Sequence, residues 1–478
     1  MRRAAAIEGV LVAAVLAAQA WLFARPIRSQ TNYDEAVYLA SLDTLRHGQT
    51  LGSDVFAPQL PGFYDLLRAI AAFTGATVVG VRAGLLAVML LGTIGAWLVG
   101  RRFGGVPGGL LAAALVVVAP PLDRFGFQVI ADTPTLALTA LALGLATLTA
   151  PVAALAAGAV FAAAVSVKLT AVTALPAFVW LLRRRPWHAA AGAAVVGLVL
   201  LALHARAVPE LWESGIAYHQ DARDVGSIPG ARRQIVHQIS ARTPFFWLAI
   251  AAGATAAFCA ALRRPLRIWP LWTWVALGLA FLLWHRPLHY NHLVVFPFTL
   301  AVATGATLGA ALPRRRLVYG AAATVLVVAY VQQVRSVEDV NVPEPEARLR
   351  ASRALERLVP PDALTIDDRP SISFFAHRRV VPELVDTAAL RFDTGSLTDE
   401  DVIRELPRAR AVVVSRVLAL RPRVLRAVRQ DFVLRYDRDA IRIYVKRSRT
   451  RTPTSRNAST GDRARATSIA LSWPLTPR

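Results

Sequence analysis

The strongest constraint on this chain is a series of apolar segments, each about as long as a bilayer is thick, with arginine clusters between them. A membrane helix needs about 20 apolar residues, or somewhat fewer where the bilayer thins. On this criterion the sequence predicts about eleven spans. They lie at 4–24, 77–100, 106–121, 131–150, 152–167, 169–182, 189–207, 244–262, 268–284, 289–312 and 317–333.

The composition supports a membrane protein and argues against a nucleic-acid partner. Hydrophobic residues make up 55% of the 478 residues and charged residues 18%, whereas soluble domains carry about 25% charge. The net charge of +23 comes from 54 Lys+Arg against 31 Asp+Glu. In the first 333 residues this excess gathers in short clusters between apolar segments, so membrane topology explains it better than nucleic-acid binding.

The arginine clusters also fix an orientation. With eleven spans, all of them fall on one side of the membrane, which the positive-inside rule makes cytoplasmic. The N-terminus is then cytoplasmic, and the first span acts as an uncleaved signal anchor. The loops 25–76, 122–130, 208–243 and 285–292, and everything after 333, become external. The clusters are Arg2-Arg3, Arg101-Arg102, Arg183 to Arg185, Arg263-Arg264 with Arg267, and Arg314 to Arg316.

The short segments 152–167 and 169–182 are separated only by Lys168. They form either a pair of short helices or one broken segment. A lone lysine at this depth could extend to the lipid headgroups. Charged groups in membrane segments are usually functional, however, and this favours a phosphate contact.

The first external loop, 25–76, has two helical patterns. Apolar residues recur at helical spacing from Tyr33 to His47, and a second run begins at Pro61 and ends near Gly75. Both are too short and too polar to span a bilayer. We therefore predict a platform of two amphipathic helices in the plane of the outer membrane surface.

The acidic pair Asp34-Glu35 stands at the start of this platform. One interpretation is a helix N-terminus, in which Thr31 and Asp34 form a capping box and the acids suit the positive end of the helix. The other is a catalytic acid pair at the membrane surface. The local pattern alone favours the helix cap.

Three short stretches resemble the GT-C glycosyltransferases, in particular the family 39 group that includes protein O-mannosyltransferases and bacterial aminoarabinose transferases. The resemblance covers residues 1 to about 335 in architecture. It implies transfer of a sugar from a polyprenyl-phosphate carrier to an acceptor hydroxyl on the external face. The stretches are Tyr33-Asp34-Glu35-Ala36-Val37-Tyr38, Phe56-Ala57-Pro58-Gln59-Leu60-Pro61-Gly62-Phe63-Tyr64, and His289-Tyr290-Asn291-His292 followed by Pro297.

The resemblance also implies roles for the acids. Asp34 matches the catalytic aspartate of the family and is assigned as the base. Glu35 is a supporting or metal-binding group, because neighbours on a helix point in different directions. Asp132 either caps the helix before Pro134 or serves as a second acid, since family members often carry one in this loop. A divalent metal held by Glu35 or Asp132 is left open, and no other cofactor is expected.

The leaving phosphate and its sugar need cations and hydrogen-bond donors. We call residues 285–292, which contain His285, His289 and His292, the His289 cluster. For this cluster we favour hydrogen bonds to phosphate and sugar over a zinc site, because no carboxylate is near in sequence. His219 and Arg223 are candidates for acceptor or loop contacts, although an exposed loop could simply be solvated. The donor-site candidates are Lys168, Arg286, His289, Tyr290, His292, Tyr64 and Gln59.

After residue 350 the pattern changes to that of a soluble α/β domain, 350–447, on the external face. Strands are expected at 363–367, 411–415, 432–434 and 441–445, and helices at 399–406, capped by Thr398, and 422–429. Asp367-Asp368 is interpreted as a strand-end turn rather than a metal site. Residues 448–478 are expected to form a disordered basic tail.

The sequence thus predicts a mainly α, polytopic membrane bundle of GT-C type (1–335) with a small external α/β domain, in the cell membrane of a bacterium. The predicted activity is hexosyl or pentosyl transfer from a polyprenyl phosphate to a polysaccharide, lipid or protein, with membrane lipids as further partners. The alternative is a polytopic transporter or a lipid-linked-sugar flippase. Transporters usually place ionisable residues near the middle of their spans, and this pattern is weak here.

Overall fold

The computed structural model describes residues 2–223, 225, 233, 237, 243–261, 268–311 and 316–447. The basic tail 448–478, much of the loop 208–243, and the clusters at 263–267 and 314–315 lie outside these residues, so the predictions made for them stay predictions.

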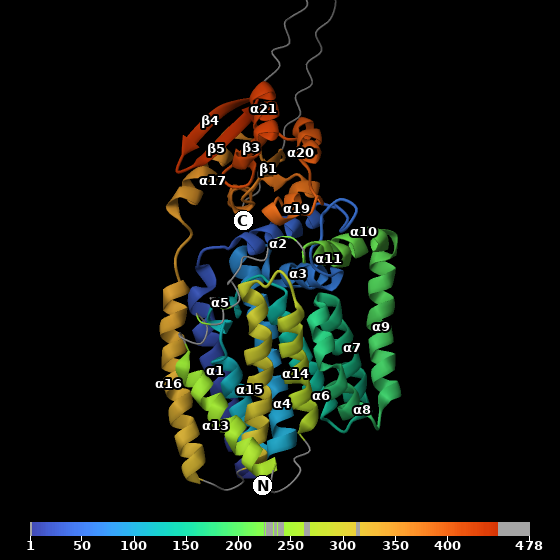
Figure 1. The fold of residues 1–478 in the computed structure, drawn as a ribbon, viewed down its shortest axis with the longest axis vertical. Coiled ribbons are helices and arrows are strands. Elements are labelled where there is room, and N and C mark those ends of the chain that lie inside the picture. Colours follow the sequence, from blue (N-terminus) through green and yellow to red (C-terminus); the bar gives the residue numbers. More distant parts are fainter. Residues whose placement is uncertain are drawn as a thin grey trace, which may run out of the picture. The chain divides into compact units, whose positions relative to one another are not determined.

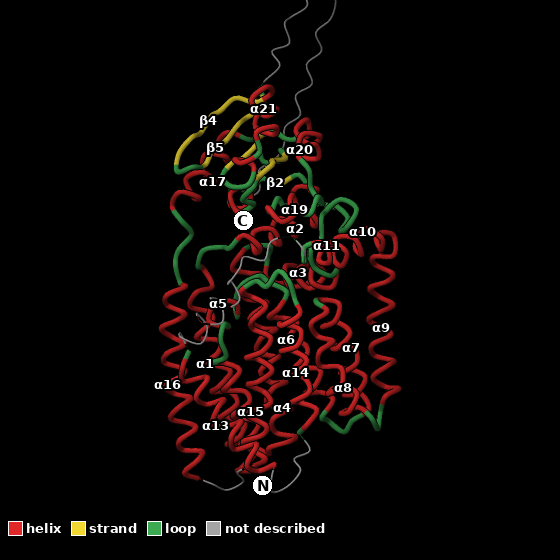
Figure 2. Tube along the Cα trace, in the orientation of Figure 1, coloured by secondary structure: helices red, strands yellow, loops and turns green. Residues whose placement is uncertain are grey.

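Long helices form the first part of the chain (Figures 1 and 2). Among the described residues, four helical stretches are long and apolar enough to cross a membrane, by length and composition, and five shorter apolar helices accompany them. The number of about eleven spans stays a prediction. The main helices of this part of the chain, which include α16 in addition to those nine, are α1 (Arg2–Ala24), α4 (Val78–Val117), α6 (Asp132–Ala146), α7 (Pro151–Val167), α8 (Leu175–Leu182), α9 (Pro186–His204), α13 (Pro244–Ala261), α14 (Trp269–Trp284), α15 (Val295–Ala311) and α16 (Arg316–Val340).

Helix α4 is interrupted at Gly105, whose φ of 65° and ψ of −164° are not helical. Glycine adopts this conformation without the steric cost that other residues meet. The halves on either side correspond to the predicted spans 77–100 and 106–121, and they touch closely: a Cβ on Gly100 would lie 2.4 Å from the carbonyl oxygen of Gly108.

Lys168 interrupts the chain between α7 and the 3-10 turn η2 (Leu169–Ala174) that leads into α8. It has extended backbone angles, φ −161° and ψ 137°. Phe161 of α7 stacks on Phe178 of α8, with ring centroids 4.2 Å apart. The two flanking segments therefore pack side by side, as two short helices would.

Small residues bring the bundle helices into close contact, as is common in membrane proteins. A Cβ on Gly305 of α15 would lie 2.3 Å from the backbone nitrogen of Ala112 in α4, and one on Gly95 of α4 would lie 2.4 Å from the backbone of Ala140 in α6. The contact between α7 and α9 is built in the same way, through Gly158. These positions leave no room for a side chain.

Short helices lie between the bundle and the sheet (Figure 1): α2 (Tyr33–Arg46), α3 (Pro61–Thr74), α10 (Val208–Trp212) and α11 (Tyr218–Asp221). The first two confirm the predicted pair of helices in the loop 25–76, whose external location stays a prediction. The predicted cap at Thr31 is wrong: Asn32 is the N-cap, and its side chain accepts a hydrogen bond from the backbone N–H of Glu35 at 2.8 Å. We refer to α2 and α3 as the platform.

The last part of the chain is an α/β domain built on a five-stranded sheet of order β2-β1-β3-β5-β4. Strand β1 is parallel to β2 and β3, whereas β5 is antiparallel to β3 and β4. Strands β1, β3, β4 and β5 and helices α20 and α21 lie at the predicted positions, whereas the two-residue strand β2 was not predicted. The elements are α17 (Glu346–Leu358), β1 (Leu364–Asp367), α18 (Ser371–Phe375), β2 (Arg379–Val380), α19 (Ala389–Asp393), α20 (Asp399–Glu405), β3 (Ala411–Val414), α21 (Pro422–Asp431), β4 (Phe432–Arg438) and β5 (Ile441–Lys446).

The α/β domain and the platform share a hydrophobic cluster. Val380 and Val385 of the domain belong to the same buried cluster as Leu39 of α2 and Phe63 of α3. Burial of apolar surface contributes about 25 cal/mol per Å². Burial of these apolar side chains therefore stabilises the contact between the domain and the platform.

Candidate functional site

A cavity of about 150 Å³ lies where the platform, the segment after α14 and the α/β domain meet. Its volume is below the roughly 300–1,000 Å³ of typical ligand pockets, so it suits one small group rather than a whole lipid. We call it the carboxylate cavity, because it contains two carboxylates from distant parts of the chain. Its lining includes Tyr33, Asp34, Tyr38, Gln59, Tyr218, His219, His285, His289, Asn291, His292 and Asp386.

Asp34 lies in the first turn of α2, and its side chain is exposed. Asp34 lines the carboxylate cavity, so the accessible surface of its side chain borders that cavity. Desolvation raises the pKa of Asp34, the positive charges of His289 and Lys168 lower it, and the negative charges of Asp386 and Asp132 raise it. A carboxylate with a raised pKa that remains open to a cavity is well suited to accept a proton.

Glu35, the neighbour of Asp34, points away from the cavity and is fully buried. The Arg82 side chain donates to both of its carboxylate oxygens, from Nε at 2.7 Å and from Nη2 at 2.5 Å. The backbone N–H of Val129 donates to it at 3.0 Å. With both oxygens engaged, the surroundings of Glu35 favour a structural role that fixes the start of α2.

Asp132 forms a buried ion pair rather than a helix cap. Lys168 Nζ lies 2.8 Å from each of its carboxylate oxygens, and the Asn291 side-chain amide donates to Oδ2 at 2.9 Å. The cap expected before Pro134 is not formed: α6 begins at Asp132, and no side chain caps it. The ion pair thus joins Asp132 and Lys168, the two residues for which the sequence left alternatives open. It lies at the edge of the carboxylate cavity, because its partner Asn291 lines that cavity.

Histidines from the segment after α14 form one wall of the cavity. The rings of His285 and His292 meet edge to face with centroids 4.4 Å apart, and the backbone N–H of His289 donates to His292 Nδ1 at 3.3 Å. Burial, followed by the positive charge of Lys168, lowers the pKa of His285 to about 4. The His285 imidazole is therefore neutral at neutral pH, so one of its ring nitrogens can donate a hydrogen bond and the other can accept one.

Two residues of the opposite wall are held by hydrogen bonds. Gln59 Nε2 donates to the hydroxyl of Tyr38 at 3.1 Å, and His219 Nε2 lies 2.6 Å from the carbonyl oxygen of Pro58. Gln59 and His219 thus both line the carboxylate cavity, and their contacts with donor and acceptor stay predictions.

A second cavity, of about 540 Å³, adjoins the first and shares Pro58, Gln59, His219, His285 and His292 with it. We call it the amphipathic cavity, because its walls combine apolar side chains with cations. Arg223 lies over the Trp284 ring, 4.1 Å from the ring centroid. The lining includes Leu60, Lys168, Leu169, Val172, Ile216, Arg223, Phe281, Trp284 and Arg286.

Two predicted site residues lie in neither cavity. Tyr64 is buried within the platform, edge to face with Tyr38. Tyr290 packs outside both cavities, with the Arg124 guanidinium over its ring at 5.3 Å. The surroundings of both residues favour packing roles.

The divalent metal left open for Glu35 and Asp132 does not fit their surroundings. Each carboxylate is already matched by a cation, Arg82 or Lys168. Within the part of the chain that the structure describes, no group of three or more His, Cys, Asp or Glu side chains could hold a metal ion.

Asp386, which follows Asp34 by more than 300 residues, was not among the predicted site residues. Its Oδ1 accepts hydrogen bonds from the Tyr33 hydroxyl at 3.0 Å and from the backbone N–H of Ala388 at 2.9 Å. Nothing in the local sequence distinguishes Asp386 from the other acids of the α/β domain. Its position follows only from the packing of that domain on α2.

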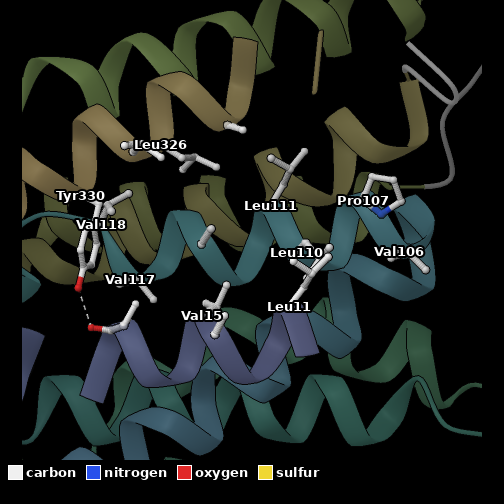
Figure 3. Close-up of a pocket in the computed structure, with 15 residues that line it drawn as sticks. Leu11, Val15, Val106, Pro107, Leu110, Leu111, Val117, Val118, Leu326 and Tyr330 are labelled. Atoms are coloured by element: carbon white, nitrogen blue, oxygen red, sulfur yellow. Dashed lines mark hydrogen bonds between the residues drawn. The ribbon is translucent and has the colours of Figure 1, made fainter. Parts of the chain in front are cut away.

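A third cavity, of about 640 Å³, is lined by apolar side chains of α1, α4 and α16 (Figure 3). Its polar feature is the Tyr330 hydroxyl, which donates to the carbonyl oxygen of Ala18 at 3.0 Å. It shares no lining residue with the other two cavities. Without an acid or base in its lining, it offers no acid–base chemistry.

Comparisons with known proteins identify the fold. No family model matches the chain, and no curated protein sequence matches it. The fold is similar to that of ArnT from Cupriavidus metallidurans bound to undecaprenyl phosphate, with a TM-score of 0.65 and 14% identity over 91% of this chain and 97% of that one.

Two further solved structures share the architecture. Archaeal oligosaccharyltransferase AglB from Archaeoglobus fulgidus, in complex with an inhibitory peptide and a dolichol-phosphate, has a TM-score of 0.52 and 12% identity over 94% of this chain and 75% of that one. Arabinofuranosyltransferase AftD from Mycobacteria has a TM-score of 0.53 and 16% identity over 94% of this chain and 40% of that one. This chain therefore has the fold of the GT-C glycosyltransferases.

Proposed function

We propose that this chain is a multi-pass membrane glycosyltransferase that moves a sugar from a polyprenyl-phosphate carrier to an acceptor hydroxyl. The observation that carries the proposal is the junction of the two cavities: a carboxylate cavity that holds Asp34 opens beside an amphipathic cavity with cations and apolar walls. Transfer from a lipid-phosphate sugar needs both cavities: a base for the acceptor hydroxyl, and a surface that matches the lipid and its phosphate.

The amphipathic cavity matches the donor. Apolar residues such as Leu169, Val172 and Phe281 suit the first isoprene units, and the cations Arg223 and Arg286 suit the phosphate. Solved structures of the same fold bind undecaprenyl phosphate and dolichol-phosphate, which supports a lipid-linked donor. Lys168 also lines this cavity, but its ammonium group already neutralises Asp132. A contact with the phosphate is therefore a second role for Lys168.

The reaction follows from this arrangement. The acceptor hydroxyl enters the carboxylate cavity and gives its proton to Asp34. Its oxygen forms a bond to the anomeric carbon while the bond from that carbon to the phosphate oxygen breaks. The polyprenyl phosphate leaves with the bonding electrons, and cations stabilise its growing negative charge. We place this site on the external face, in a bacterial cell envelope.

The test is transfer by the full chain in nanodiscs, with labelled undecaprenyl-phosphate pentose and hexose donors and cell-envelope fractions as acceptors. We expect Asp34→Asn to lose transfer by about 100-fold or more, because general base catalysis is typically worth that much. Binding of undecaprenyl phosphate should change by less than about twofold, since Asp34 lies outside the donor cavity.

Asp43→Asn is the matched control. Asp43 lies in the same helix, about half a turn around from Asp34, and outside both cavities. It should transfer at the wild-type rate. Full transfer by Asp34→Asn would exclude its role as base, and binding of the donor without any transfer by the wild type would favour a transporter or flippase.

A further inference from the structure

The α/β domain contributes a carboxylate to the cavity in which the proposed acceptor binds. Asp386 is buried, and Oδ1 of its carboxylate is occupied by Tyr33 and Ala388. Oδ2 has no hydrogen bond to any residue that the structure describes, and Asp386 lines the carboxylate cavity. One oxygen thus anchors the side chain, and the other is available to a ligand.

The backbone around Asp386 is held in place from several directions. Arg391, itself buried, donates to the Asp386 carbonyl oxygen at 2.5 Å, and the N–H of Thr387 donates to the Tyr33 hydroxyl at 3.0 Å. The Arg416 guanidinium covers the Tyr33 ring, 4.6 Å from the ring centroid. A carboxylate held in this way is preorganised, so a ligand meets it at little entropic cost.

Charge is distributed unequally between the neighbouring cavities. The carboxylate cavity contains Asp34 and Asp386, whereas the amphipathic cavity contains Lys168, Arg223 and Arg286. A further cavity of about 340 Å³ shares Tyr218 with the carboxylate cavity, and its lining includes Glu210, Glu213 and Asp221. Among the described residues, the side chains that line the two cavities of the acceptor side thus include carboxylates and no lysine or arginine, whereas those that line the donor side include three cations and no carboxylate.

We infer that Asp386 determines acceptor specificity: it accepts a hydrogen bond from a second polar group of the acceptor and excludes acceptors that carry negative charge beside the reacting hydroxyl. This inference rests on the proposed function and adds the acceptor class, a neutral or amino-bearing glycoside. An anionic group placed next to two carboxylates would meet like charges, which cost several kcal/mol when they are brought together at an interface. Such repulsion is a usual source of specificity.

The inference can be tested by binding alone, with methyl glucoside and two derivatives that each change one of its positions: methyl glucosaminide, with an amino group at C2, and methyl glucuronide, with a carboxylate at C6. Saturation-transfer NMR on the full chain in nanodiscs measures their weak affinities. The wild type should bind the first two and bind the glucuronide at least about tenfold more weakly. In Asp386→Asn this discrimination should shrink to about threefold or less.

Two variants control for folding and for general charge effects. Asp386→Glu keeps the charge and should keep the discrimination. Asp393→Asn removes an exposed carboxylate of α19 outside these cavities, and it should behave as the wild type. If the wild type binds the glucuronide as well as the glucoside, binds none of the probes, or keeps its preference in Asp386→Asn, the inference is wrong.

A separate measurement isolates the proposed function. Undecaprenyl phosphate should bind to wild type and Asp386→Asn with the same affinity, because Asp386 does not line the amphipathic cavity. Glycoside discrimination without binding of undecaprenyl phosphate would contradict the lipid-linked donor and leave the acceptor inference standing. Binding of undecaprenyl phosphate without glycoside discrimination would contradict the acceptor inference alone.

Discussion

At the residue scale, Asp34 and Glu35 are adjacent carboxylates with opposite surroundings. Glu35 is enclosed by Arg82 and backbone donors, whereas Asp34 is open to a cavity. Burying a charge is costly unless it is paired, and Arg82 supplies the pair for Glu35. The pair fixes the first turn of α2 and thereby the direction in which Asp34 points.

The raised pKa of Asp34 predicts the pH dependence of transfer. The base must be deprotonated, so the rate should rise with pH through the pKa of Asp34, which desolvation raises above the ordinary value for an aspartate. His289, Lys168, Asp386 and Asp132 are the charged groups that act on it. Asp386→Asn removes a charge that raises this pKa, so the rising limb should move to lower pH.

Rate against pH in nanodiscs measures the position of this limb. Asp393→Asn serves as the control and should leave the limb where it is in the wild type. A limb that moves to higher pH in Asp386→Asn would contradict the assignment of Asp34 as the titrating base.

At the scale of elements, the bundle depends on glycines at helix crossings. Gly305 of α15 meets the backbone of α4, while Gly197 of α9 has no atom within 4 Å of the place where its Cβ would be. The same residue type therefore has different roles in two apolar helices. At one position it allows close approach, and at the other it only weakens the helix.

We expect Gly305→Ala to destabilise the bundle and Gly197→Ala to leave it unchanged or more stable. The added methyl in Gly305→Ala would lie 2.3 Å from the Ala112 nitrogen, and such overpacking costs about 1–3 kcal/mol. Gly197→Ala should stabilise by up to about 1 kcal/mol, because alanine is the better helix former. Thermal unfolding in detergent compares them, and equal shifts for both variants would argue against the close crossing.

At the scale of the whole described chain, the α/β domain completes the site that the membrane helices begin. Its contacts with the first turn of α2 pass through Tyr33, whose hydroxyl bonds to Asp386 and Thr387 and whose ring lies under Arg416. Residues on either side of the carboxylate cavity therefore depend on one interface. We expect the position of the domain to govern the acceptor side more than the donor side.

Tyr33→Phe tests this dependence. It removes the hydroxyl and leaves the Thr387 N–H without its acceptor, a loss of about 1–3 kcal/mol. Hydrogen exchange in residues 385–391 should become faster, while exchange in α15 should not change. Tyr436→Phe is the control, because the Tyr436 hydroxyl is buried without a hydrogen bond to the described residues. Unchanged exchange at 385–391 in Tyr33→Phe would show that the hydroxyl does not hold this loop.

Hydrophobic pattern and turn chemistry are local properties of the sequence, and they determined most of the secondary structure of this protein. They predicted the apolar helices, the platform, the break at Lys168 and most of the strands, and short stretches pointed to Asp34 and the His289 cluster. Only the tertiary structure decided which charges meet. The partners of Glu35 and Asp132 lie 47 and 36 residues away, at Arg82 and Lys168. Asp386 reaches the cavity through packing between domains, which no local pattern encodes.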